Sequence, residues 1–517
     1  MKLSSSSIML AIENIKIEND TDLFPSLKEF EIIYNNKTEI VNYLTNIDIG
    51  YYNWLDSRRF IIPKSENSYR TATQLNIIDS IMFSSLMFEF GSYIENHRIP
   101  IEDEKVFNYR FSPSKEGYLY SKNIGWETFW NSSRNKIEKY NYAVYLDISD
   151  FYNQISHHTI EQQLQYSGIP DEVVKSIITF LGKLTKKISR GIPIGPHSVH
   201  LLAELSLIPV DNSLLTRGFD FCRFSDDIII FTSTYEDAKL AIYYLAEILD
   251  KQQKLILQQQ KTKIFEKDIF IDHCEHMVEN KMTSGLESKM ISIINKHSSS
   301  PYEKIKITKL LPSEIDVYST SNIESVIQEI ISQSEIDYMK LRWFIRRLTQ
   351  IGSGGAVLIC LQNLNIMLPA INDIMLYLLS VANNKSNMHD EGNVLVDLLS
   401  NKIISSNEFF QIAILNLFTS SNKFDHINKI VNIYKTSSEN IRREIILSAY
   451  KAGACDWIRE LKEDFNTMGC WCQRAYIIAC SILPKDEKDI YLRKNIKLLY
   501  NATDFLENQL IAWSVAQ

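Results

Sequence analysis

Two β-rich segments that place aspartates where strands end or turn constrain this 517-residue chain more than any other feature. The first, YAVYLDISDFYNQIS (142–156), alternates apolar and aromatic residues up to Asp147. The second, FDFCRFSDDIIIFTS (219–233), joins two apolar runs at Asp226 and Asp227, which predicts a hairpin with adjacent acids at its turn. If the two segments are neighbouring strands, their carboxylates meet.

Clustered carboxylates supply what phosphoryl transfer requires. Carboxylate oxygens are the ligands that Mg²⁺ prefers, and two ions roughly 3.5–4 Å apart can orient an attacking hydroxyl and neutralise a leaving pyrophosphate. We therefore expect Asp147 and Asp226 to be shared ligands of two Mg²⁺ ions. Two interpretations of Asp227 stay open: it is either a weak metal ligand or a residue that orients the turn.

A loop rich in Gly and Pro, GIPIGPHS (191–198), lies between the two segments and leads into an apolar helical run. Glycine allows a backbone to approach a base and sugar closely. We therefore predict Gly195 as a nucleotide-binding residue. The alternative is an ordinary junction between a loop and a helix.

The character of the sequence changes near residue 300. Up to about residue 275, β-rich segments alternate with helical periodicity, as in 237–249, and the stretch 297–314 then breaks the pattern with turn-forming residues. We predict two domains, residues 1–300 and 301–517, of which the second is all-helical. Amphipathic helices are expected at 337–351, 407–418 and 440–452. Helix pairs stacked in series would produce this helical pattern in residues 301–517, although the sequence shows no fixed period that supports a helical repeat.

Charge and composition exclude several classes of protein. Residues 1–300 carry a net charge of −7 and residues 301–517 a net charge of −1, which excludes a broad basic face. Any nucleic acid must then bind in a confined channel, because generic phosphate binding needs clustered cations.

The seven sparse cysteines indicate reduced thiols and a cytoplasmic protein. The apolar stretch 356–382 is interrupted by polar residues, so we expect no membrane segment.

The ordered set of motifs resembles the palm of reverse transcriptases. YLDISDFY corresponds to motif A, GIPIGPHS to motif B, FSDD, in place of the usual Y-x-D-D, to motif C, and QQQKTKIF (258–265) to motif D. Upstream, IIPKSENSYR (61–70) is similar to a fingers motif. This similarity implies that Lys64 and Arg70 grip the triphosphate of an incoming nucleotide, a polyanion that suits two cations.

The same resemblance implies two further roles. Tyr152, five residues after Asp147, matches the aromatic steric gate whose ring clashes with a 2′-hydroxyl, so deoxynucleotides (dNTPs) are the expected substrates. Lys261 or Lys263 of motif D can donate a proton to the departing pyrophosphate, and we prefer Lys261.

More specifically, the chain resembles the abortive-infection (Abi) and unknown-group reverse transcriptases of bacterial phage defence, the AbiK and AbiA type. Motif B has Ile194 where retroviral and group II intron enzymes place Gln, EKVFNYRFSP (104–113) precedes motif A, and a helical half follows. The resemblance implies an α/β right-hand polymerase with fingers and palm, followed by an all-α helical-repeat (HEAT-like) domain, without RNase H. Arg110 is a candidate contact to nucleotide or RNA.

This resemblance implies a DNA polymerase that acts in antiphage defence in the bacterial cytoplasm. Synthesis is then untemplated or copies a dedicated non-coding RNA, a tyrosine of the protein primes it and stays covalently attached to the DNA, and the chain forms homo-oligomers, trimers or hexamers. The sequence does not single out the tyrosine among candidates such as Tyr34, Tyr43, Tyr51 and Tyr52. The alternative is a catalytically silent RNA-binding scaffold. The intact acids favour activity, because a scaffold does not need mutually repelling carboxylates.

Overall fold

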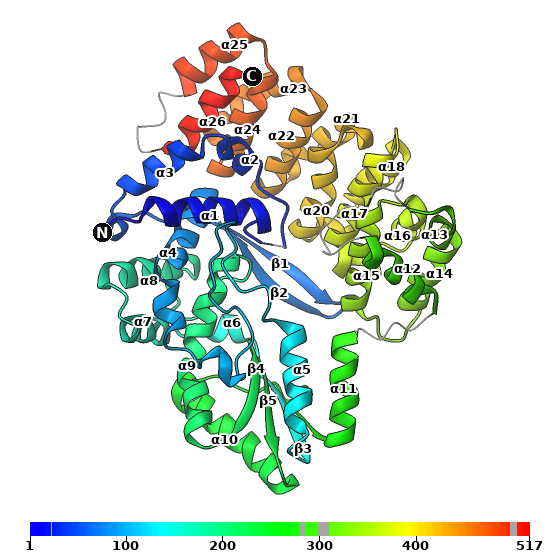
Figure 1. Ribbon diagram of the computed structural model, residues 1–517. Helices are drawn as coiled ribbons and strands as arrows, with labels where there is room; N and C mark the ends of the chain where they lie inside the picture. The colour runs from blue at the N-terminus through cyan, green and yellow to red at the C-terminus, as the bar shows by residue number, and fades with distance from the viewer. Residues whose placement is uncertain (22, 280–284, 298–304, 306–309, 497–503) are drawn as a thin grey trace. The chain divides into compact units, whose positions relative to one another are not determined.

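Separated stretches of the sequence come together in this computed structural model to form two units. The structure describes residues 1–21, 23–279, 285–297, 305, 310–496 and 504–517 (Figure 1). Unit 1 consists of Met1–Asp22, Tyr34–Ser57 and Thr73–Lys281, and unit 2 of Leu23–Ile33, Arg58–Ala72 and Met282–Gln517. The predicted domains, 1–300 and 301–517, stay a prediction, and most of the expected boundary stretch lies outside the described residues.

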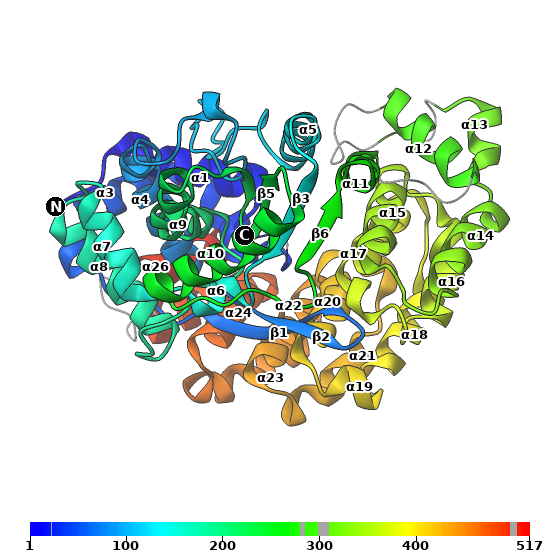
Figure 2. The same cartoon turned by 90° about the horizontal axis from the view of Figure 1, so that it is seen from below.

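The segments that carry the aspartates form a four-stranded sheet in unit 1 (Figure 2). Its strands are β3 (Tyr142–Asp147), β4 (Asp220–Phe224), β5 (Asp227–Thr232) and β6 (Lys263–Glu266). Their order across the sheet is β4-β5-β3-β6, and every neighbouring pair is antiparallel. The predicted strands and the hairpin between β4 and β5 are confirmed, and motif D supplies the edge strand β6.

Unit 1 contains most helices of the first half of the chain. These are α1 (Ser5–Glu18), α3 (Lys37–Asn46), α4 (Ile77–Glu95), α5 (Trp126–Ile137), α6 (Phe151–Gln154), α7 (His157–Tyr166), α8 (Asp171–Leu184), α9 (His200–Thr216), α10 (Tyr235–Gln253) and α11 (Lys267–Glu279), with the short 3₁₀ turns η1 (Ile49–Tyr51), η2 (Ile101–Asp103) and η3 (His197–Val199). The side chain of Thr234 caps α10 by accepting a hydrogen bond from the backbone of Asp237. α10 therefore includes the helix predicted from periodicity.

The register of the sheet brings the acids to one end of one face. Asp147 is the cross-strand partner of Asp227, and Ala143 and Tyr145 precede Asp147 on the same face because side chains alternate along a strand. Helices α5 and α11 pack against this face and against each other, and they close an apolar core that includes Trp130. The acids thus lie at the edge of a well-packed layer.

One described helix, α4, is long and apolar enough to cross a membrane. The protein buries 83% of the most apolar 18-residue stretch of α4, and the helices α1 and α9 contact α4. A core helix of a globular unit has these properties, because a helix that is hydrophobic all round must be buried.

Unit 2 contains the predicted fingers hairpin, formed by β1 (Arg58–Ser65) and β2 (Ser68–Gln74), whose last two residues belong to unit 1. Phe60 of β1 packs against Phe24, and Phe24 packs against Phe409 in the helical part of the unit. The side-chain amide of Asn407 donates to the backbone carbonyl of Ile61. The hairpin is therefore anchored to helices of the C-terminal half.

The helical part of unit 2 confirms the three predicted amphipathic helices. Beyond residue 284, every regular element within the described part of the chain is helical. The helices of unit 2 are α2 (Lys28–Tyr34), α12 (Gly285–His297), α13 (Pro312–Val317), α14 (Thr320–Ile331), α15 (Tyr338–Ile351), α16 (Val357–Gln362), α17 (Ile371–Asn384), α18 (His389–Leu398), α19 (Lys402–Ser405), α20 (Glu408–Ser420), α21 (Ile427–Ile430), α22 (Glu439–Ala452), α23 (Cys455–Glu460), α24 (Cys470–Ala479), α25 (Lys485–Ile490) and α26 (Phe505–Ala516). Short helical turns connect them: η5 (Gly354–Ala356), η6 (Leu368–Ala370), η7 (Asn422–Phe424), η8 (Val431–Thr436), η9 (Leu461–Thr467), η10 (Cys480–Ile482) and η11 (Tyr491–Ile496).

The long helices of unit 2 pack in series. α15 contacts α17, α17 contacts α20, and the series continues through α22 and α24 to α26 (Figure 1). A buried ion network joins this series to α2 and to the hairpin: Arg443 lies 2.6 Å from both Glu29 and Glu444, and Arg58 lies 3.3 Å from Glu444. These ion pairs explain why short N-terminal stretches belong to the helical unit.

Candidate active site

Asp147, Asp226 and Asp227 converge at the end of β3 and the turn between β4 and β5. Asp147 is the last residue of β3 and is buried, and Asp227 lies opposite it as the first residue of β5. The turn consists of Ser225, whose φ is 56°, and Asp226, whose carbonyl accepts a hydrogen bond from the backbone of Ile148. The structure therefore brings the three sequence-predicted acids together.

Burial and crowding change the acidity of two of these carboxylates. Burial and the charge of Asp147 raise the pKa of Asp226. Burial and the charge of Asp226 raise the pKa of Asp227 to about 7, although a hydrogen bond from Tyr145 lowers it. The Tyr145 hydroxyl donates to Oδ1 of Asp227 at 2.5 Å. Concentrated negative charge of this kind favours a bound cation.

The bond from Tyr145 bears on the open question of Asp227. One carboxylate oxygen of Asp227 already accepts a hydrogen bond from Tyr145, so this side chain is held against β3. That contact supports the interpretation in which Asp227 orients the turn. The role of Tyr145 was not predicted from the sequence. The pattern that could have indicated it is a hydroxyl-bearing side chain two residues before Asp147, on the same face of the strand.

Motif D delivers a cation to the acids. The backbone of Gln258 donates to the carbonyl of Asp147 at 2.7 Å, which fixes the start of the motif beside the end of β3. Lys261 then places Nζ 2.6 Å from Oδ2 of Asp147. Burial opposes the charge of Lys261, but the bond to Asp147 and the nearby carboxylates raise its pKa. Lys263 pairs with Tyr145 in the sheet, and Lys261 contacts Asp147; the role of Lys261 as the acid stays a prediction.

A buried ion network supports the turn of the β4–β5 hairpin. Arg223 on β4 is fully buried, and it donates to both carboxylate oxygens of Asp211 at 2.7 Å and to the carbonyl of Ser225 at 3.1 Å. Glu204 lies 3.0 Å from the same guanidinium and 2.7 Å from Arg98. Because Glu204 and Asp211 belong to α9, this network ties the turn to a core helix.

Sequence reasoning missed this network. Its signal was a cation inside the apolar strand FDFCRF and an acid inside the apolar helix LLAELSL. Charged residues are almost never fully buried unless they are paired, so each should have predicted a partner.

Gly195 permits a close approach of two backbones. Its φ is +137°, and a Cβ atom at this position would lie 2.5 Å from the carbonyl oxygen of Thr73. The neighbouring Ile194 accepts a hydrogen bond from the backbone of Thr73 at 2.7 Å. The glycine therefore serves the contact between the motif B loop and the end of β2, and a direct role with a nucleotide stays a prediction.

The motif B loop also runs along α6, which carries Tyr152. The backbone of Ile192 donates to the carbonyl of Tyr152 at 2.9 Å, and Gly191 donates to Ile155 at 2.7 Å. The hydroxyl of Tyr152 contacts Nδ1 of His200 at 2.5 Å. Hydrogen bonds thus connect the motif B loop, Tyr152 and α9.

The other predicted nucleotide contacts have different surroundings. Lys64 is exposed on β1 and Arg70 is half-buried on β2; both belong to unit 2, and their grip on a triphosphate stays a prediction. Arg110 is only 2% exposed, its guanidinium lies 2.6 Å from Glu95, and it donates to the carbonyl of Ile99. We therefore correct the prediction for Arg110: it is a core ion-pair residue.

The donor set fits Mg²⁺ when substrate phosphates complete the coordination. Among the described residues, no group of three or more His, Cys, Asp or Glu side chains forms a ready metal cage. Mg²⁺ is usually held by one or two carboxylates together with waters and substrate phosphates, so a full protein cage is not needed. Asp147 and Asp226 supply such carboxylates; burial and the charge of Asp147 raise the pKa of Asp226, and a bound cation would neutralise that charge.

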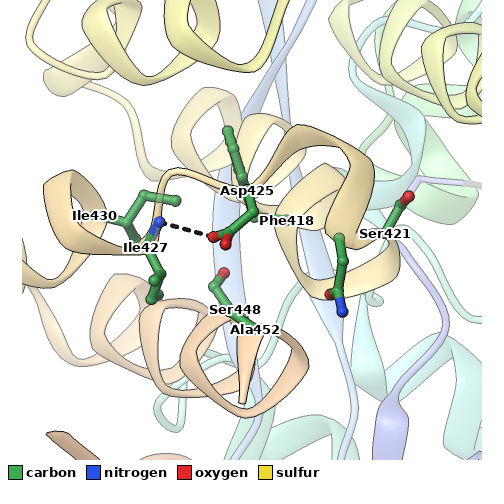
Figure 3. A pocket seen from close by; sticks show the side chains of 8 residues that line it. Phe418, Ser421, Asp425, Ile427, Ile430, Ser448 and Ala452 are labelled. Carbon is green, nitrogen blue, oxygen red and sulfur yellow. Dashed lines mark hydrogen bonds between the residues drawn. The ribbon is translucent and has the colours of Figure 1, made fainter. Parts of the chain in front are cut away.

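A small pocket in unit 2 differs in kind from this site (Figure 3). Phe418, Ile427, Ile430 and Ala452 give it a largely apolar lining. Its carboxylate, Asp425, accepts a hydrogen bond from the backbone of Ile427 at the start of α21. These residues have ordinary packing and capping roles, so the pocket is not a candidate active site.

A comparison with protein families agrees with the motifs. Residues 62–305, a little less than half of the chain, match the family "Reverse transcriptase (RNA-dependent DNA polymerase)". Curated proteins include no match. Among solved structures, telomerase from Candida albicans, in complex with a TWJ fragment of telomeric RNA, is similar at 11% identity with a TM-score of 0.30, and the alignment covers 79% of this chain and 71% of that chain.

The family match and the acid cluster define the class of this domain. Residues 62–305 thus match a reverse-transcriptase domain, a class of domain that belongs to the nucleotidyltransferases of the polymerase type. Domains of this class use divalent metal ions, in agreement with the carboxylates found at the sheet end.

Proposed function

We propose that this protein is a DNA polymerase of the reverse-transcriptase type that adds dNTPs with two Mg²⁺ ions and acts in bacterial antiphage defence. One observation carries the catalytic part: Asp147, Asp226 and Lys261 meet at one end of the sheet inside a reverse-transcriptase domain. Two carboxylates and an ammonium that meet at one point are unusual in a domain that performs no reaction. The scaffold alternative offers no reason for them.

In this proposal Asp147 and Asp226 hold the metal ions. When bound, the ions lower the barrier to attack by a 3′-hydroxyl and neutralise the pyrophosphate. Asp227, held by Tyr145, keeps the turn in place. Lys261 holds a proton beside Asp147 and donates it to the departing pyrophosphate, and the ring of Tyr152 excludes a 2′-hydroxyl.

The biological setting rests on the motif resemblance. Ile194 in motif B, the block 104–113 and the helical C-terminal half support a place among the abortive-infection reverse transcriptases of bacteria. We propose a cytoplasmic homo-oligomer, a trimer or hexamer, that makes DNA without a template or copies a dedicated non-coding RNA. The serial packing of long helices supports a HEAT-like repeat in unit 2.

Protein priming is also part of the proposal. Of the four upstream tyrosines, Tyr51 is 90% exposed, whereas Tyr52 donates to Asp79 and Tyr34 donates to Glu13. An exposed hydroxyl is the better acceptor for a first nucleotide. Tyr51 is therefore the first residue to examine.

The test uses the purified chain with its retained nucleic acid. Mg²⁺ and one labelled dNTP at a time are added, and products are separated before and after protease and RNase treatment. We expect label that stays with the protein until proteolysis, and mapping the labelled peptide identifies the tyrosine. Synthesis that survives RNase indicates an untemplated enzyme, and synthesis that RNase abolishes indicates a copied RNA.

A matched pair of variants controls this experiment. Asp226→Asn should abolish incorporation, whereas Asp250→Asn, at an exposed carboxylate paired with Lys254 near the end of α10, should leave it unchanged. Equal incorporation by Asp226→Asn and wild type would refute the site. No incorporation by wild type with any dNTP or rNTP would favour the RNA-binding scaffold.

A further inference from the structure

The proposed sugar gate, Tyr152, has a partner outside the known motifs. Tyr152 lies in α6, and its hydroxyl contacts Nδ1 of His200, the first residue of α9, at 2.5 Å. His200 in turn stacks face to face on Tyr109, with ring centroids 4.0 Å apart and an interplanar angle of 7°. The hydroxyl of Tyr152 therefore contacts a histidine whose ring is stacked on that of Tyr109.

The protonation of this pair follows from its surroundings. Burial, together with the neighbouring charge of His197, lowers the pKa of His200 to about 3. Burial and the negative charges around the site raise the pKa of Tyr152 well above its ordinary value. A neutral imidazole therefore accepts at Nδ1, and the tyrosine hydroxyl donates.

The histidine itself is fixed from several sides. The hydroxyl of Tyr120 donates to the carbonyl of His197, which begins the turn leading into α9. The backbone carbonyl of Tyr109 accepts a hydrogen bond from Arg98 at 2.8 Å. Because the stacked ring and the helix start are both held, Nδ1 of His200 has a defined position.

A sugar gate works only if its ring is held in place. A 2′-hydroxyl is a small group, and functional groups need to stay within roughly 0.5 Å of the productive geometry to discriminate. The backbone of Tyr152 is held by the bond from Ile192, and the far end of its side chain is held by His200. Two fixed ends leave the ring little freedom to tilt.

We propose that His200 is the positioning residue of Tyr152 and thereby sets the preference for deoxyribose over ribose. This inference rests on the proposed polymerase function and assigns His200 a part in choosing the substrate class. His200 acts through the tyrosine, since its ring nitrogen is bonded to the gate hydroxyl.

The experiment compares the kcat/KM for dATP with that for ATP in a set of variants. Tyr152→Phe removes the donor and keeps the ring, and His200→Leu removes the acceptor. We expect each to reduce the preference for dATP about tenfold, the effect of one lost hydrogen bond. The change should appear mainly in the KM for ATP, which should fall, and less in the kcat for ATP.

Two further variants and a control variant separate positioning from general damage. The double variant Tyr152→Phe/His200→Leu should match either single variant, because both remove the same bond. His200→Asn should restore most of the preference, because its amide oxygen can accept near the position of Nδ1. His97→Leu, at a half-buried histidine whose ring lies 5.3 Å from that of Tyr166, serves as the matched control.

The outcomes distinguish this inference from the function on which it rests. If wild type discriminates between the sugars and His200→Leu discriminates equally well, the inference is overturned and the polymerase remains. If wild type incorporates no nucleotide, the proposed function fails, and NMR of ¹⁵N-labelled histidines still tests the contact. An Nδ1 resonance of His200 that does not change in Tyr152→Phe overturns it, and a changed resonance supports the positioning role.

Discussion

The ammonium of Lys261 lies 2.6 Å from Oδ2 of Asp147, although 113 residues separate the two positions in the chain. Two backbone contacts produce this proximity: the bond from Gln258 to the carbonyl of Asp147, and the pairing of β6 with β3. The cation therefore stands beside the carboxylate that ends the central strand. The ammonium of Lys261 can therefore donate a proton to a pyrophosphate that leaves from metal ions held by Asp147.

Replacement of Lys261 by Met should reduce the rate of nucleotide addition by at least about 100-fold, since general acids contribute on the order of 10²–10⁴-fold. Lys263→Met, at the exposed end of β6, is the matched control and should change the rate less than about threefold. Single-turnover incorporation of a labelled dNTP measures both. Equal losses in the two variants would remove Lys261 from the reaction.

Replacement of Arg223 by Met should destabilise unit 1 by about 3–5 kcal/mol, because it leaves Glu204 and Asp211 without one of their cations inside the core. Denaturant unfolding followed by tryptophan fluorescence measures the change. Arg217→Met, which removes an exposed pair with Glu247, should cost less than about 1 kcal/mol. A similar cost for both would show that the buried network does not support the turn.

Replacement of Gly195 by Ala should destabilise the motif B loop by about 1–3 kcal/mol and reduce incorporation, because a Cβ would meet the carbonyl of Thr73. Gly182→Ala is the matched control: it lies within α8, where a Cβ meets nothing within 4 Å, and it should stabilise by about 0.5–1 kcal/mol. Thermal unfolding compares the two. A neutral Gly195→Ala would contradict the close approach.

His200 should make the stability of unit 1 depend on pH. Its pKa is about 3 in the folded protein and ordinarily about 6.5, so the unfolded chain binds more protons between these values. Stability contributed by neutral His200 is present above about pH 6.5 and is lost as the pH falls toward about 3. His197, Tyr109 and Tyr152 are the groups that face it.

The measurement compares wild type with His200→Asn, which cannot titrate. From about pH 8 to about pH 5, the unfolding midpoint of wild type should fall relative to that of the variant. Parallel midpoints across this range would show that His200 does not titrate with folding.

The sequence predicted the strands and their acids because strand periodicity and turn chemistry are local. Alternation in 142–147 and the acids between two apolar runs at 219–233 were sufficient to predict β3, β4 and β5. Helical periodicity predicted α10, α15, α20 and α22 to within a few residues of their observed bounds. These features depend on neighbours in the chain, and the motif order supplied the rest of the catalytic prediction.

Tertiary structure alone decided which charged groups pair. Arg110 looked like a ligand contact in its motif, yet the fold buries it against Glu95, because a buried cation must find an acid wherever the chain places one. The sequence also does not show that Tyr145 donates a hydrogen bond to Asp227 or that the hydroxyl of Tyr152 contacts His200. Nor does it show that short N-terminal stretches belong to the helical unit. Such pairings depend on contacts between distant segments, which local pattern and propensity do not encode.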